Sequence, residues 1–233
     1  MANHRLTRRN ELRIVMNLPV ILGIISFLSF FTVSVVLFQL TYAQNNSTEF
    51  RSGNFTDYGN STLGVNVKYP SEWQRAVQAG GGISIIQFFS PLQNKSDIFR
   101  ENVNIAIENL PNNKTNVTQY SRASLSVIAK SLPGFNLTKS NTSENFHGTP
   151  AVEKTFTAKQ AVLDRNLKAV ALDLKMTQIY TLKNNKAYVI TFAAESSNYD
   201  RFLPTVAKIL DSFQIMNQAP NTNGGTSHNA TAS

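Results

Sequence analysis

The chain has 233 residues, no cysteine and a formal net charge of +8. Without cysteine it forms no disulfide and has no thiol chemistry, and its length allows one domain with additional segments. Residues 1–13 carry +3 of the charge, so the rest of the chain carries only +5. That excess is too small to indicate a nucleic-acid-binding protein.

The N-terminal region predicts a membrane segment. Residues 18–40 contain no charged side chain and are nearly all apolar. As a helix they would span about 35 Å, enough to cross a bilayer core. Arginines precede this run, and no lysine or arginine follows it before Arg51. We therefore expect one transmembrane helix or uncleaved signal anchor over residues 14–42, with residues 1–13 in the cytoplasm and the domain outside the cell membrane. The alternative is a secretory signal that is cleaved after Ala43.

Candidate glycosylation sites agree with export. The sequence contains ten Asn-x-Ser/Thr motifs, and all of them follow the hydrophobic run. This distribution fits an exported surface that carries glycans. The alternative is that Asn, Ser and Thr are simply common in exported polar loops. We expect modification in the polar segments beside the domain, at Asn45, Asn46, Asn54, Asn60 and Asn229.

Polar segments set the expected domain boundaries. Residues 43–62 are rich in Asn, Ser, Thr and Gly and predict a linker. Residues 217–233 have a similar composition and predict a disordered tail. One folded domain is therefore expected over residues 63–216.

The first half of this domain predicts strands and then a helix. Alternating apolar residues indicate strands over residues 64–69 and 102–109. Between them, Gly80, Gly81 and Gly82 separate the two strands of a predicted hairpin. We expect the helix that follows to start with Thr118 as its N-cap and to end before Pro133.

The second half predicts more strands and a closing helix. Residues 135–143 and 149–160 indicate two strands, and residues 164–166 a turn. The last helix is expected to start at Leu203, with Pro204 in its first turn, where a missing N–H costs little.

A long hairpin near the C-terminus allows a prediction of register. Even-numbered residues are mostly apolar along residues 170–182 and again along the strand that follows. A three-residue loop, residues 183–185, would put both apolar sets on one side by pairing Tyr180 with Tyr188. Such loops usually end in a left-handed residue, so we predict a positive φ at Asn185.

Together the predicted elements indicate an α+β domain, with an antiparallel sheet and two well-separated helices. Four segments of the chain resemble a known family. Residues 64–73, in which Tyr69-Pro70 precedes Trp73, are similar to the strand and Tyr-Pro-x-x-Trp opening of PsbP-like proteins. Three further segments resemble the family's next central strand, its hairpin and its closing helix; they are residues 102–107, 179–188 and 210–213.

The resemblance covers roughly residues 55–216 and is strongest to the exported PsbP-like proteins of archaea. It implies an αβα sandwich around a central antiparallel sheet. PsbP itself supports the oxygen-evolving complex of photosystem II, partly through a longer N-terminal segment. Here a predicted membrane helix and an Asn-rich linker replace that segment. No residue-by-residue match carries over a metal or photosystem site.

The sequence predicts no catalytic, cofactor or metal site. His147 is the only histidine inside the predicted domain, and one His without Cys cannot build a zinc site. Scattered acids could pair only in the folded chain; they are Glu72, Asp97, Glu101, Asp164, Asp173, Glu195 and Asp200. A set of basic residues could meet an anionic surface if it shared one face, although an ordinary solvated face is the simpler reading; it comprises Lys154, Lys159, Arg165, Lys168, Lys175, Lys183 and Lys186.

We therefore expect a non-enzymatic binding or accessory module, held outside the membrane by one helix, that associates with an envelope or membrane protein and not with nucleic acid. The first alternative is a carrier of a small apolar ligand, which needs a deep apolar pocket. The second is a hydrolase whose carboxylates converge in a cleft.

Overall fold

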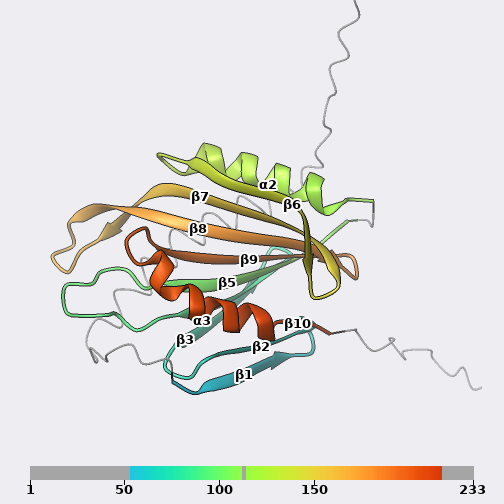
Figure 1. Ribbon diagram of the computed structural model, residues 1–233, viewed down its shortest axis with the longest axis horizontal. Coiled ribbons are helices and arrows are strands. Elements are labelled where there is room, and N and C mark those ends of the chain that lie inside the picture. Colours follow the sequence, from blue (N-terminus) through green and yellow to red (C-terminus); the bar gives the residue numbers. More distant parts are fainter. Residues whose placement is uncertain (1–52, 112–113, 217–233) are drawn as a thin grey trace, which may run out of the picture.

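The computed structural model describes residues 53–111 and 114–216, which form ten strands and two helices (Figure 1). The predicted membrane helix, residues 14–42, and the predicted tail, residues 217–233, lie outside the described residues. Neither of the two described helices is long and apolar enough to cross a membrane.

The strands are β1 (Phe55–Asn60), β2 (Val65–Pro70), β3 (Gln74–Gly80), β4 (Ile83–Phe89), β5 (Asn102–Asn109), β6 (Asn136–Phe146), β7 (Thr149–Leu163), β8 (Ala169–Lys183), β9 (Lys186–Glu195) and β10 (Gln214–Ile215). The helices are α2 (Val117–Ser131) and α3 (Tyr199–Ser212). Seven strands form one antiparallel sheet in the order β3-β4-β5-β9-β8-β7-β6, and β1, β2 and β10 form a second sheet. This is the α+β fold that the sequence predicts.

The two helices pack on opposite faces of the large sheet. On one face, Ile128 of α2 packs in a cluster with Phe156 and Leu174. On the other, Val206 of α3 packs with Ile190 of β9. Residues that alternate along a strand point to opposite faces, so the central strands carry apolar side chains on both sides.

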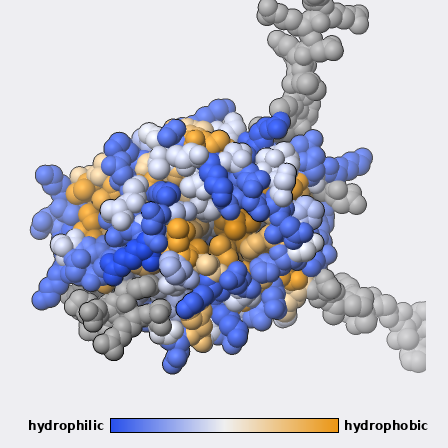
Figure 2. Space-filling view, viewed as in Figure 1, coloured by the Kyte–Doolittle hydropathy of each residue, from blue (hydrophilic) through white to orange (hydrophobic). Residues whose placement is uncertain are grey.

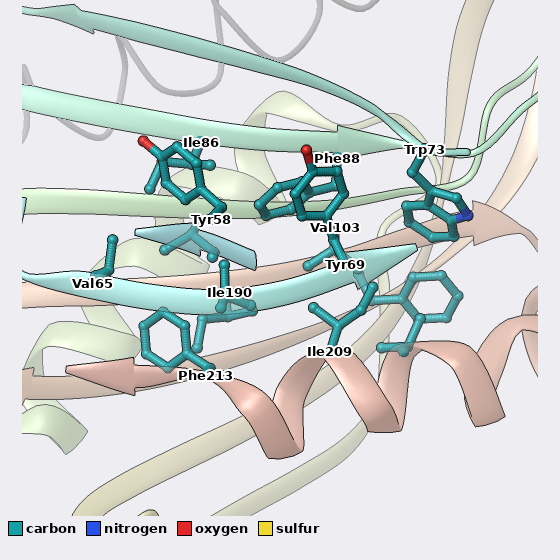
Figure 3. Close-up of a cluster of buried hydrophobic side chains, with 14 of the residues drawn as sticks. Tyr58, Val65, Tyr69, Trp73, Ile86, Phe88, Val103, Ile190, Ile209 and Phe213 are labelled. Atoms are coloured by element: carbon teal, nitrogen blue, oxygen red, sulfur yellow. The ribbon is translucent and has the colours of Figure 1, made fainter. Parts of the chain in front are cut away.

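The largest core cluster lies between the α3 face of the large sheet, α3 itself and the small sheet (Figure 3). Tyr69 of β2 stacks on Phe88 of β4, with ring centroids 4.5 Å apart. Trp73 packs against Phe202 of α3. Five aromatic residues of the large sheet are all buried: Phe88, Phe89, Tyr180, Tyr188 and Phe192. Burial of such large rings supplies much of the hydrophobic stabilisation of a domain of this size.

The register predicted for the long hairpin is wrong. Leu182 pairs with Ala187, so the loop has two residues, Asn184 and Asn185. Both have positive φ, 53° and 58°, which is the geometry of a type I′ turn and confirms the positive φ predicted at Asn185. The prediction failed because it assumed one buried face, whereas all of β9 except its two end residues is buried on both faces.

Both helices begin earlier than predicted. The N-cap of α2 is Asn116, not Thr118, because the Asn116 side chain accepts a hydrogen bond from the backbone N–H of Gln119 at 2.8 Å. α3 starts at Tyr199, so Pro204 lies inside the helix. Burial of Tyr199, whose ring lies 4.9 Å from that of Phe192, favours this additional turn and outweighs the cost of the proline.

The folded domain also begins before residue 63. β1 lies within residues 43–62, the segment predicted as a linker, and pairs with β2 along its whole length. Tyr58 of β1 is buried and packs edge-on against Phe88. Polar composition predicted a linker here, but one buried aromatic residue and a complete strand pairing place the segment in the domain.

The β8–β9 turn provides a test of the role of the Asn185 side chain. Asn185 donates a hydrogen bond from Nδ2 to the carbonyl oxygen of Leu110 at 2.7 Å, whereas Asn184 contributes only its tolerance of positive φ. We expect Asn185→Ala to lower the free energy of unfolding by about 1 kcal/mol more than Asn184→Ala, because only the first substitution removes that bond. Urea unfolding of both variants measures the difference. Equal losses would contradict the observed role of the Asn185 side chain.

Candidate functional site

A groove of about 460 Å³ lies on the α3 face of the large sheet, between α3 and strands β6 to β8. We call it the α3 groove. Figure 2 shows apolar residues in a hollow at the centre of this face, surrounded by hydrophilic residues. Its lining residues are Val103, Thr138, Lys139, Glu153, Thr155, Lys175, Thr177, Ile179, Ile190, Phe192, Tyr199, Asp200, Leu203, Val206 and Leu210.

The floor and one wall of the groove are apolar. Ile179 of β8 pairs with Ile190 of β9, so both point to the same face of the sheet. On the helix, Leu203, Val206 and Leu210 recur at helical spacing and form the wall. Leu203 is 40% exposed, so this apolar lining reaches the surface.

The polar side of the groove is formed by β6, β7, β8 and the first turn of α3, and its charges are paired with each other. Lys139 Nζ lies 2.6 Å from a carboxylate oxygen of Glu153, and Lys175 Nζ lies 3.4 Å from Asp200. The hydrogen bond to Glu153 raises the pKa of Lys139. The two ion pairs cancel in charge, so this side does not select an ion by net charge.

Hydroxyl groups form a short chain across the groove. Thr155 Oγ1 and Thr177 Oγ1 are 2.7 Å apart, and Thr177 is also hydrogen-bonded to the hydroxyl of Tyr199. The ammonium of Lys175 lies 4.1 Å from the centre of the Tyr199 ring. These contacts hold the N-terminal turn of α3 against the sheet and offer a few polar groups within an otherwise apolar site.

The β6–β7 hairpin holds the other end of α3. At its tip, His147 has a φ of 50°, and its Nε2 lies 2.8 Å from the carbonyl oxygen of Leu210. Phe146 stacks on Phe213, with ring centroids 5.7 Å apart. His147 is therefore a loop residue that links the hairpin to the helix.

Three of the scattered acids meet in space, although outside the groove. The carboxylate of buried Glu101 accepts hydrogen bonds from Ser90, Gln93 and Asn198, and Asn198 immediately precedes α3. Asn198 also donates to Glu195 at 3.5 Å. This cluster connects the segment between β4 and β5 to the start of α3.

Burial shifts the protonation of this cluster. Desolvation, with a contribution from the nearby negative charge of Asp97, raises the pKa of Glu101 to about 7. Burial also raises the pKa of Glu195, and the negative charge of Asp97 adds a smaller effect in the same direction. Within residues 53–111 and 114–216, no group of three or more His, Asp or Glu side chains is placed to hold a metal ion. Glu101 is buried, Asp97 and Glu195 are half-buried, and none of the three lines the groove.

The predicted basic set does not share one face. Lys154 reaches Ser140 on the α2 side of the sheet, Lys175 lines the α3 groove, and Lys159 pairs with Asp173 at 2.7 Å. Alternation along β7 puts only Lys154 of these three on the α2 side, whereas Lys159 and Lys175 lie on the α3 side of the sheet. Burial lowers the pKa of Lys154, with Arg122 adding a smaller effect in the same direction.

Of the glycosylation candidates, Asn45, Asn46 and Asn229 lie outside the described residues. Asn54 is exposed just before β1. Asn60 is half-buried and closes the β1–β2 turn, since its Oδ1 accepts from the backbone N–H of Leu63 at 2.9 Å. Their use as glycan sites stays a prediction.

Sequence reasoning missed the groove itself. Its residues come from β5 to β9 and α3, and several of them are ordinary Thr, Lys and Ile residues of buried or half-buried strand positions. The one local signal was the apolar stripe of α3, in which Leu203 continues beyond the buried positions.

Comparison with known proteins places the chain in a family. A sequence model described as PsbP-like protein matches residues 14–215, so the chain belongs to the PsbP-like family. Among curated proteins none matches significantly.

Solved structures with a similar arrangement include cyanobacterial PsbP (CyanoP) from Synechocystis, at 15% identity and a TM-score of 0.46, covering 74% of this chain and 98% of that one. A Pseudomonas aeruginosa protein of unknown function aligns at 18% identity and a TM-score of 0.44, covering 67% and 93%. The Saccharomyces cerevisiae Ran-binding protein Mog1p aligns at 8% identity and a TM-score of 0.47, covering 70% and 96%.

The acid cluster predicts how stability depends on pH. Because the pKa of Glu101 rises from 4.5 to about 7 on folding, the folded state holds its proton more tightly. Stability is then fully present below pH 4.5 and falls as the pH rises towards 7, by at most about 3 kcal/mol. We expect Glu101→Gln to remove most of this decline. The unfolding midpoints of the wild type and of Glu101→Gln are measured from pH 5 to pH 8. The same pH dependence of the midpoint in both proteins would refute the effect.

Proposed function

We propose that this protein is a non-enzymatic binding module whose α3 groove receives an apolar side chain or short apolar segment of a membrane or envelope protein. The observation that carries the proposal is the exposure of Leu203 at the edge of a groove whose floor, Ile179, Ile190 and Phe192, is apolar. Apolar pockets that open to the surface and are rimmed by polar groups are typical of protein contacts.

The polar side of the groove supports binding more than catalysis. Its charges, Lys139 with Glu153 and Lys175 with Asp200, are paired with each other. Its hydroxyls are hydrogen-bonded along one chain. A nucleophile needs an adjacent base and a place for the reacting atom, and none of the acids around Glu101 lines the groove.

The location of the module is part of the proposal. The uncharged run over residues 18–40, preceded by arginines, supports a single-pass anchor with the domain on the outer side. Secretion after cleavage beyond Ala43 is the alternative and places the domain on the same side.

Two leucines of equal exposure test the groove. Leu203 lines it and Leu137 does not, yet each is 40% exposed. We expect Leu203→Glu to reduce partner recovery roughly tenfold, because a carboxylate would have to be buried against apolar surface, while Leu137→Glu leaves recovery unchanged. Tagged proteins are purified from gently solubilised native membranes, and co-purifying proteins are quantified by mass spectrometry. Equal recovery with both variants at equal thermal stability would refute the groove as the contact.

A second candidate function is the carriage of a small apolar ligand. The groove volume of about 460 Å³ falls in the range of ligand sites, and the Thr177–Tyr199 hydroxyls offer polar contacts within it.

Native mass spectrometry of the protein taken directly from its membranes tests the carrier function. We expect one additional small mass in the wild type and its loss in Ile179→Trp, which fills the groove. Leu137→Trp is the control and keeps the mass. A wild-type spectrum without an additional mass would exclude the carrier.

A further inference from the structure

The hairpin of β7 and β8 extends beyond the rest of the large sheet. β7 and β8 pair with each other as far as Leu163 and Ala169. β9 pairs with β8 only from Leu174 onward, and β6 pairs with β7 only up to Thr157. Residues 158–173 therefore form a two-stranded projection, which we call the arm (Figure 1).

One face of the arm is covered and the other is not. On the covered face, Val162 is buried in the cluster that contains Ile128 of α2. On the opposite face, Ala161, Leu163, Ala169 and Ala171 are exposed; Leu163 is 36% exposed. The apolar surface at the left end of Figure 2 corresponds to this part of the molecule.

Leu167, at the tip of the arm, is an unusual residue type for its position in the turn. The N–H of Leu167 bonds to Asp164 O at 3.0 Å and that of Asp164 to Lys168 O at 2.8 Å, which defines a three-residue loop. The last loop residue has φ 60°, where Gly or Asn is usual and a branched side chain is strained. Yet Leu167 is 65% exposed, the highest value among the large exposed apolar residues described. Neither backbone geometry nor core packing accounts for a leucine here.

The charges around the tip are predominantly basic. Arg165 and Lys168 are exposed. The one acid of the loop, Asp164, is engaged with the backbone, because its Oδ1 accepts from the N–H groups of Asn166 and Lys168, both at 2.8 Å. The tip thus presents two leucines with two cations beside them.

We propose that the arm contacts the surface of an anionic membrane, with Leu163 and Leu167 at the acyl boundary and Arg165 and Lys168 against lipid headgroups. Such mixed apolar and basic surfaces bind the membrane interface. A protein partner is the less favoured occupant, because a narrow convex tip offers less area than a stable protein interface buries.

This inference rests on the proposed membrane anchor, which would keep the tip close to lipid. A contact that is weak on its own then acts at a high effective concentration. The arm does not include residues of the α3 groove, so lipid contact and partner binding would not compete for the same side chains.

The absence of cysteine allows a single label to test the arm. Full-length protein carrying Asn166→Cys with an environment-sensitive fluorophore is reconstituted into phosphatidylcholine vesicles, with or without phosphatidylglycerol, and quenched by brominated lipid. We expect strong quenching only with phosphatidylglycerol. The same label at Val77→Cys, a residue that is 45% exposed on β3, is expected to stay unquenched.

Two variants separate lipid contact from folding. In the labelled background, Leu167→Asn suits the positive φ and should preserve or raise thermal stability while it removes most quenching. Charge reversal by Arg165→Glu and Lys168→Glu should reduce the quenching that depends on phosphatidylglycerol roughly tenfold. Quenching that is absent, that is equal in both lipid mixtures, or that survives Leu167→Asn would overturn the proposal, as would a label response that requires added membrane proteins. Resistance of the protein to carbonate extraction from the same vesicles reports the anchor separately.

Discussion

The burial of β9 on both faces is the constraint on which the rest of this structure depends. Tyr188, Ile190 and Phe192 enter the core under α3, while Ala187, Val189 and Ala193 point to the α2 side. Because side chains alternate along a strand, a shift of one residue would exchange the two sets. The large rings fit only the side where α3 and the small sheet leave room for them. The two-residue Asn184-Asn185 turn is the connection that meets this requirement.

The α3 groove exists because α3 covers only part of one face of the large sheet. α3 packs over β9 and β2, and the residues of β7 and β8 on the same face are a mixture of Thr, Lys and Glu with Ile179. The β6–β7 hairpin approaches the helix again only at its tip, through His147 and Phe146. Between these contacts an apolar floor stays accessible. A helix with Leu203 at its open side is suited to receive an apolar group from outside.

Two residues, Glu101 and Leu167, have environments that are unfavourable for their residue types. Glu101 is a carboxyl group kept in the interior, where desolvation raises its pKa to about 7, and Leu167 is a leucine with positive φ in solvent. Hydrogen bonds from Ser90, Gln93 and Asn198 offset part of the cost of burying Glu101, whereas neither backbone geometry nor core packing accounts for Leu167. Local choices that oppose stability are expected at positions that serve function. Glu101 lies immediately before β5 and Leu167 at the end of the arm. The proposed partner site, the α3 groove, and the proposed lipid contact, the tip of the arm, would lie on separate parts of one small domain.

Sequence patterns by themselves indicated the strands from β2 to β9, the hairpin at Gly80 to Gly82 and the bounds of β5, because alternation and turn residues act over a few positions. They also indicated the PsbP-like family, which the family match over residues 14–215 confirms. Tertiary structure decided what these local signals leave open: the register of β8 on β9, the start of α3 at Tyr199, the inclusion of β1, and the meeting of Asp97, Glu101 and Glu195. Each of these depends on which face of an element is buried and against what. That is a property of packing between segments far apart in the chain, and no local pattern encodes it.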